Sequence, residues 1–127
     1  GGTAVFTNPV GPVKCGGAPH KIMYLACDYW RKQGILDKCN VHYLSGAGVI
    51  FDIKEYAATL TDVIKNRNIK PHFGVHVQEI DGANKTVYYE EKDANGVAER
   101  KEMKFVSRCA SAVGTRVYKK QPACRSK

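Results

Sequence analysis

The 127-residue sequence contains no C-x-x-C pair, and its five cysteines are an odd set without short paired spacings. This pattern argues against a closed disulfide framework and against a structural zinc site. No apolar run is long enough to cross a bilayer, and no internal repeat or low-complexity tract occurs. An initiator Met and a signal peptide are also lacking, so we expect a fragment of a longer protein. The length suits one domain with a real core.

Acidic residues are scarce at one end of the chain, which accounts for most of the net charge of +8. Residues 107–127 contain no acid and six bases: Arg108, Arg116, Lys119, Lys120, Arg125 and Lys127. The tail therefore supplies six of the eight charges, which leaves +2 for the rest of the chain. A globular nucleic-acid binder spreads its basic residues over a face of the fold. We therefore expect no nucleic-acid partner, and we expect residues 107–127 to be a poorly ordered basic tail.

The first half of the chain predicts a strand, a helix and a second strand. Residues 3–7 and 40–45 are β-prone, and residues 19–33 have helical spacing and end before Gly34. The predicted core face of this helix consists of Ile22, Leu25, Ala26 and Tyr29, widened by Met23 and Trp30. Since strands joined through a helix run parallel, we expect a parallel pair.

A second helix has a clear start signal. Asp52 is placed as an N-cap and Glu55 completes a capping box, while Phe51 is placed to contact Tyr56. The apolar residues that follow have helical spacing up to residue 64. This helix is expected to be structural.

After Pro71 the apolar period changes to two, which predicts a strand over residues 73–77. Turns at residues 81–84 and 93–96 predict two more strands, 86–91 and 97–105, in an antiparallel meander. His72 and His76 would lie roughly 13 Å apart along extended backbone, so a shared metal is not expected, and His42 has no obvious partner. The predicted fold is α/β: a partial Rossmann-like βαβαβ unit with an antiparallel β-meander.

Glycine-rich turns invite a test for dinucleotide binding. The turn Gly46-Ala47-Gly48 follows a strand, but the fingerprint G-x-G-x-x-G needs a third glycine where Phe51 stands. The first strand-helix turn lacks the fingerprint as well. A plain turn is therefore favoured at both places, and no cofactor-binding residue is assigned.

Cys15 lies between the first strand and the first helix. Gly16 and Gly17 would let the backbone turn, and the positive end of the helix, with Lys14 and a protonated His20, would help the thiol to ionise. The alternative is an inert small residue that fills the strand-helix junction. The local sequence leaves both interpretations open.

The segment of residues 13–25, V-K-C-G-G-A-P-H-K-I-M-Y-L, resembles the first redox-active cysteine segment of the sulfide:quinone oxidoreductases, in their animal mitochondrial form. The resemblance extends from residue 3 to about residue 105, roughly four-fifths of the chain. Members of that family usually have Ala and Gln where this chain has Gly16 and His20. These differences leave the turn plausible.

The resemblance implies a flavoprotein of the two-domain FAD/NAD(P)-binding class, related to the disulfide reductases. Residues 1–106 would be most of its second, NAD(P)-binding-like domain, which presents a cysteine to the flavin. Cys15 would be one of two cysteines that bridge through sulfur near FAD. Sulfide attacks the bridge and forms a persulfide, two electrons pass through FAD to ubiquinone, and glutathione or sulfite accepts the sulfur.

Several parts of that machinery lie outside the matching region. These are the FAD fingerprint, the second cysteine, the quinone site and the C-terminal segment through which alone the family associates with the inner mitochondrial membrane. FAD is therefore not expected to bind this fragment, which should be inactive alone. Residues 107–127 resemble nothing in the family, so neither Cys109 nor Cys124 is assigned as the second cysteine. The alternative hypothesis is a truncated, non-catalytic domain that acts at most as a sulfur carrier or binding module.

Overall fold

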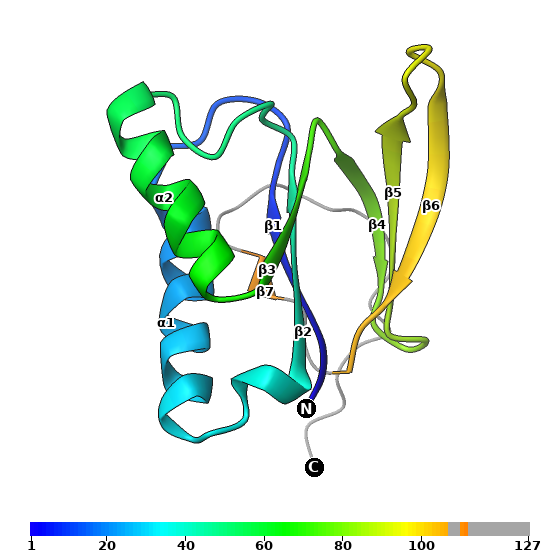
Figure 1. The fold of residues 1–127 in the computed structure, drawn as a ribbon. Helices are drawn as coiled ribbons and strands as arrows, with labels where there is room; N and C mark the ends of the chain where they lie inside the picture. Colours follow the sequence, from blue (N-terminus) through cyan, green and yellow to red (C-terminus); the bar gives the residue numbers. More distant parts are fainter. Residues whose placement is uncertain (107–109, 112–127) are drawn as a thin grey trace.

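The computed structural model describes residues 1–106 together with residues 110 and 111. In this part of the chain a parallel sheet carries two helices on one face and an antiparallel meander on the other (Figure 1). The parallel sheet contains β1 (Gly2–Asn8), β2 (Cys39–Ser45), β3 (Ile69–Phe73) and β7 (Ala110–Ser111). The helices are α1 (Ala18–Lys32) and α2 (Lys54–Asn66), with a short 3₁₀ helix η1 (Leu36–Lys38), and the meander contains β4 (His76–Asp81), β5 (Thr86–Lys92) and β6 (Ala98–Lys104). The predicted α/β fold with its parallel unit and meander is confirmed.

The strand order β3-β2-β1-β7 places β1 inside the parallel sheet. The chain advances from β1 to β2 to β3 in one direction, whereas β7 pairs with the other side of β1. In open sheets of this kind, the point where the order reverses leaves a crevice outside the carboxyl ends of the strands. Here that point is the carboxyl end of β1, at Asn8.

Two apolar clusters fill the spaces on either side of the parallel sheet. The cluster under the helices contains Phe6, Met23, Cys27, Leu36, Val41, Tyr43, Ile50, Ile64 and Ile69. The cluster under the meander contains Val5, Leu44, Val75, Val87, Tyr89 and Phe105. Because successive strand residues point to opposite faces, β1 places Val5 in one cluster and Phe6 in the other. Burial on both faces is what an interior parallel strand requires.

The helix α1 buries only part of its predicted core face. Met23 and Cys27 are fully buried, whereas the exposed fractions of Ile22, Leu25 and Tyr29 are 43%, 65% and 61%. The prediction was right for Met23, and for Ala26 and Trp30, which pack against the cluster under the helices, and it was wrong for the three exposed residues. Residues 23 and 27 are four apart, and residues 22, 25 and 29 are three and four apart, so both stripes satisfy the helical period. Only the path of the chain from β1 across the sheet decides which stripe faces inward.

The predicted capping box of α2 was also wrong. The N-cap is Ile53, whose backbone is extended, and no side-chain hydrogen bond closes the first turn. Asp52 therefore precedes the cap by one residue and does not pair with Glu55 as expected. The predicted contact between Phe51 and Tyr56 is present, with ring centroids 6.2 Å apart.

The single strand predicted over residues 73–77 is two strands in two different sheets. Gly74, with a φ of 67°, lies between β3 and β4 and donates its N–H to the Ala47 carbonyl at 3.0 Å. A left-handed backbone at this point favours glycine. Consequently His72 belongs to β3 and His76 to β4, rather than to one strand.

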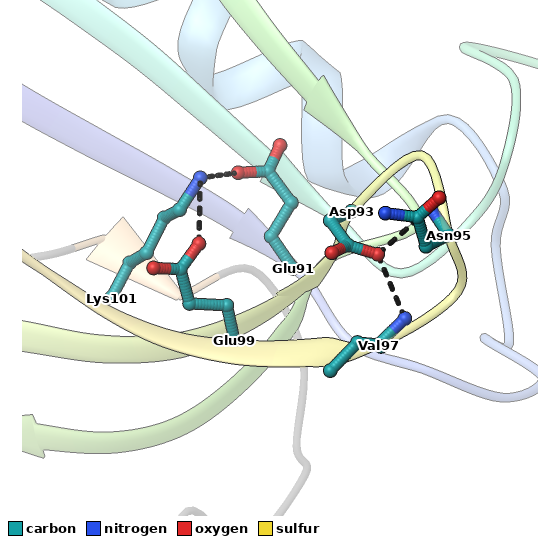
Figure 2. Close-up of polar contacts among 6 residues, drawn as sticks. All are labelled: Glu91, Asp93, Asn95, Val97, Glu99 and Lys101. Atoms are coloured by element: carbon teal, nitrogen blue, oxygen red, sulfur yellow. Dashed lines mark hydrogen bonds and ion pairs between the residues drawn. The ribbon is translucent and has the colours of Figure 1, made fainter.

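The turns of the meander are those that the sequence predicted. Asp81 Oδ1 accepts two backbone N–H groups at 3.0 Å between β4 and β5. Asp93 Oδ1 accepts the N–H groups of Asn95 and Val97 at 2.9 and 2.8 Å between β5 and β6 (Figure 2). These side chains replace the backbone partners that the turns lack, which is the usual role of Asp in a tight turn.

The basic tail of residues 107–127 is described only at Ala110 and Ser111, which form β7 and pair in parallel with β1. These two residues extend the sheet, where the sequence predicted irregular structure. The other tail positions, including Cys109 and Cys124, lie outside the described residues, and so does the expectation made for them.

Candidate functional site

Cys15 lies in the loop of residues 9–17, which joins the carboxyl end of β1 to α1. Its side chain is exposed, and its carbonyl oxygen accepts the Ala18 N–H at 3.1 Å. Cys27 is fully buried, and burial raises the pKa of its thiol to about 11. Cys39 is half-buried and donates to a backbone carbonyl at 3.3 Å. Of the three cysteines that the structure describes, Cys15 alone is open to solvent, which contradicts the interpretation as a buried filler.

The helix α1 presents its amino end to the Cys15 loop. The first turn holds no acidic residue and no side-chain cap, while Arg31 and Lys32 occupy the last turn. The aligned peptide dipoles leave a partial positive charge at this amino end. The surroundings of the loop therefore favour a negatively charged group.

The two glycines after Cys15 have a smaller backbone role than predicted. Gly17 is the N-cap with a φ of −83°, and the left-handed position in the loop is Gly11, with a φ of 105°. A Cβ on Gly16 would lie 3.4 Å from Phe51 Cε2, which is close to ordinary contact. The loop therefore depends on Gly11 for its turn.

Of the two predicted supporting cations, one is exposed and one is neutral. Lys14 is exposed, and among the described residues it makes no ion pair. His20 is only 3% exposed, and burial lowers the pKa of its ring below the usual 6.5. Its ring meets three others edge-on, each at 5.9 Å: Tyr24, Tyr43 and Phe51. His20 is therefore neutral near pH 7 and packs under the loop. It does not supply the positive charge that a protonated ring was expected to place near Cys15.

A cleft of about 380 Å³ opens at the carboxyl ends of β1 and β2, between the loops that precede α1 and α2. Asn8, Gly16, His20, Gly46 and Asp52 are among its lining residues. This is the place where ligands bind in open α/β sheets. Cys15 itself does not line the cleft, but it is next in sequence to Gly16, which does.

The cleft is polar and carries one acidic side chain. Asn8 Nδ2 donates to Ser45 Oγ at 3.1 Å, while Asn8 Oδ1 is buried without a partner among the described residues. Asp52, displaced from the cap position predicted for it, lines the cleft instead. The sequence interpretation missed Asn8 and gave Asp52 another role. The available signal was a polar residue at the carboxyl end of a strand that is otherwise buried.

Gly46 is required for packing. A Cβ at this position would lie 2.6 Å from Val10 Cγ2 and 2.7 Å from Val10 Cα. This close approach accounts for the first glycine of the Gly46-Ala47-Gly48 turn without a bound phosphate.

In the described part of the chain, no group of three or more His, Cys, Asp or Glu side chains is arranged to hold a metal ion. The expectation that His42 lacks a partner was wrong. His42 Nδ1 lies 3.0 Å from His72 Nε2 across β2 and β3, away from the Cys15 loop. Neither described helix is long and apolar enough to span a membrane.

Three-quarters of the chain aligns with curated proteins. It is 39% identical over 95 residues to the mitochondrial sulfide:quinone oxidoreductase of Dictyostelium discoideum and 38% identical over 95 residues to that of Mus musculus. The chain is thus partly homologous to mitochondrial sulfide:quinone oxidoreductases. Each alignment covers 75% of this chain and 21% of the relative, so the chain spans about a fifth of the length of the curated relatives it matches. No family model matches the sequence.

Two solved structures share the fold. The sulfide:quinone oxidoreductase of the hyperthermophilic bacterium Aquifex aeolicus superposes with a TM-score of 0.64 and 22% identity, covering 91% of this chain and 27% of that one. A chain of the Tetrahymena thermophila mitochondrial ATP synthase superposes with a TM-score of 0.66 and 10% identity, covering 90% and 27%. At these identities the likeness shows the fold alone. Since proteins with such different names share it, function has to be argued from the site.

Proposed function

We propose that the chain is part of a sulfide:quinone oxidoreductase in which Cys15 is the persulfide-forming residue. The observation that carries the proposal is the exposed Cys15 thiol in the loop that lines the cleft at the carboxyl end of β1, in a chain partly homologous to these enzymes. Residues 1–106 would form most of the second, NAD(P)-binding-like domain of the longer protein. Sulfur exchange needs an accessible thiol, a condition that Cys15 meets and Cys27 does not.

The proposed reaction begins at a sulfur bridge between Cys15 and a second cysteine outside the described residues. Hydrosulfide attacks the bridge, one S–S bond breaks, a persulfide forms on Cys15, and the second cysteine leaves as a thiolate with the electron pair. The sulfide sulfur is thereby oxidised by two electrons, and ubiquinone is the final acceptor of both. Glutathione or sulfite then attacks the outer sulfur, and the Cys15 thiolate leaves.

The residues described here do not make a flavin site of their own. The loop before α1 lacks the glycine fingerprint, and the Asp52 carboxylate in the cleft opposes a bound pyrophosphate. FAD would supply two-electron transfer in the longer protein. This chain would supply the Cys15 thiol and the loop before α1 that holds it. The isolated chain is accordingly expected to be inactive as an oxidoreductase. Its relatives are mitochondrial proteins, which supports a mitochondrial location for the parent, and association with the inner membrane stays a prediction.

The test of the enzymatic proposal uses the longer protein that contains this chain. We expect flavin absorption and sulfide-dependent reduction of ubiquinone, and we expect Cys15→Ser to abolish the reduction. Cys39→Ser is the matched control, because Cys39 is half-buried and lies at the start of β2, at the opposite end of that strand from the cleft. Undiminished turnover in Cys15→Ser would refute the assignment.

A second function, sulfur carriage by the 127-residue chain itself, is favoured by the exposed thiol of Cys15 in a chain without a flavin site. The Cys15 thiolate would attack the terminal sulfur of an inorganic polysulfide, and the shortened polysulfide would leave. The test compares intact masses after polysulfide treatment in a Cys109→Ser/Cys124→Ser background. Carriage predicts the gain of one sulfur atom that is lost with Cys15→Ser and retained with Cys27→Ser. A gain that survives Cys15→Ser refutes it.

A further inference from the structure

Two histidines meet on the face of the parallel sheet that the meander covers. His42 Nδ1 of β2 and His72 Nε2 of β3 are 3.0 Å apart, and the two rings are stacked with centroids 5.3 Å apart. The His72 ring lies 6.4 Å from that of Tyr89, a buried residue of β5. Leu44, on the same side of β2 as His42, belongs to the apolar cluster under the meander. The pair therefore lies at the seam between the sheet and the meander.

We propose that the His42–His72 pair is a proton-sensitive latch beneath the meander: at neutral pH its hydrogen bond joins β2 to β3 under Tyr89 of β5, and in acid its positive charges loosen the contact between the sheet and the meander. A hydrogen bond between two imidazoles requires a lone pair on one of the facing nitrogens. The pair can therefore carry at most one proton between those nitrogens. When both rings are protonated the bond is lost, and two like charges face each other across 3.0 Å in a partly buried seam.

The charged groups around His72 act in both directions. Burial is the main cause of its lowered pKa; among the charges, Glu91 of β5 has the largest effect and favours protonation, while Lys101 of β6 and Lys70 of β3 oppose it. Glu91 is itself engaged, because Lys101 Nζ lies 2.8 Å from Glu91 Oε2 and 3.8 Å from Glu99 Oε2 (Figure 2). The Glu91 carboxylate is thus paired with Lys101, whose charge opposes the effect of Glu91 on His72.

In the described part of the chain, apolar and aromatic side chains also lie on the side of the parallel sheet that carries the pair. Val5 of β1 is paired with His42, and Val77 of β4 packs against the cluster under the meander. Tyr89 supplies a ring whose own pKa is raised by burial. Burial, followed by the His72 and Lys70 charges, lowers the pKa of His42 to about 4, and burial also lowers that of His72. The folded structure therefore favours the pair in which neither histidine ring is protonated.

The sign of the pH effect follows from these directions. An unfolded histidine has a pKa near 6.5, so between about pH 6.5 and 4 the unfolded chain binds more protons than the folded one. Stability is complete above pH 6.5 and is lost as the pH falls toward 4. With a folded pKa of about 4, His42 alone would raise the unfolding equilibrium constant about 25-fold between pH 7.5 and 5.

The test compares the full 127-residue chain with a His42→Gln/His72→Gln variant, whose amides form hydrogen bonds but do not titrate. Chemical denaturation at pH 7.5 and 5 should show an effect of at least about 25-fold in the parent chain, and the variant should lose the His42 part of it while it keeps the smaller contribution of the buried His20. His76→Gln is the matched control, since His76 is exposed on β4 and should leave the pH dependence unchanged. Equal pH dependence in all three chains would overturn the proposal.

Two further measurements remain informative if the double variant does not fold. In the parent chain, amide hydrogen exchange at pH 5 should show β5 and β6 losing protection before β1 and β2 do. NMR titration should show the His42 ring titrating well below pH 6.5. Simultaneous loss of protection in all strands, or an ordinary titration of His42, would overturn the latch.

Discussion

Replacing Gly46 with alanine would place a methyl group where the backbone of another loop already lies. The new Cβ would be 2.6 Å from Val10 Cγ2, 2.7 Å from Val10 Cα and 2.8 Å from Val10 N. Two of these three atoms belong to the backbone and cannot rotate away. The Gly46 N–H also donates to the Asn8 carbonyl at 2.9 Å, so moving either segment would stretch that bond.

The expected destabilisation has two parts. Overpacking of this kind costs about 1–3 kcal/mol, and a weakened hydrogen bond adds about 1 kcal/mol. We therefore expect Gly46→Ala to lower the free energy of unfolding by about 3 kcal/mol, which raises the unfolding equilibrium constant on the order of a hundredfold. The variant should also shift the loop of residues 9–17 and with it the wall of the cleft beside Cys15.

The matched control is Gly48→Ala, two residues further along the same turn. A Cβ at Gly48 would meet nothing within 4 Å, and the φ of Gly48 is not in the left-handed region. Its replacement should therefore be neutral or stabilising by about 0.4–1 kcal/mol, because alanine restricts the unfolded chain. Urea denaturation measures both variants. Equal stabilities of the two would refute the close approach of Gly46 to residue 10, and with it the shape of the cleft.

Three further predictions test the placement of α1 and the accessibility of Cys15 and Cys27. Met23→Ala should cost about 2–5 kcal/mol and Leu25→Ala less than about 0.5 kcal/mol, as measured by denaturation, because Met23 is fully buried and Leu25 is 65% exposed. The reverse order would show that Leu25, rather than Met23, faces the core. Iodoacetamide should label Cys15 before Cys27 in the folded chain, as followed by peptide mass spectrometry, since burial holds the pKa of Cys27 at about 11; labelling at equal rates would contradict this. Tyr24→Phe should be neutral or stabilising by up to about 1 kcal/mol, because its buried hydroxyl has no partner among the described residues; a loss of stability would point to a partner.

Local patterns in the sequence were sufficient for the element types and for most of the turns. The change of apolar period after Pro71 predicted that the second half is rich in strands, although β3 already begins at Ile69, and Asp81 and Asp93 marked the two meander turns that their carboxylates close. The place of Cys15 between the first strand and the first helix also followed from order along the chain. These features depend on residues within a few positions of one another, and sequence records such neighbours directly.

These local sequence patterns could not predict contacts between segments that are far apart in the chain. His42 and His72 are 30 residues apart, and only the register of β2 against β3 brings their nitrogens together. The burial of His20 among three aromatic rings likewise depends on packing between α1, β2 and the loop before α2. A lone histidine in a sequence contains no signal for either arrangement.

The sequence by itself determined the α/β order, the meander turns and a cysteine at the mouth of a helix, because periodicity, glycine and turn chemistry are local properties. Only the tertiary structure decided which of two equivalent stripes of α1 is buried, whether Cys15 is exposed, and which histidines meet. Each of these depends on how the helices and the meander lie across the parallel sheet. That placement is set by many weak apolar contacts acting together, and no short stretch of sequence specifies it.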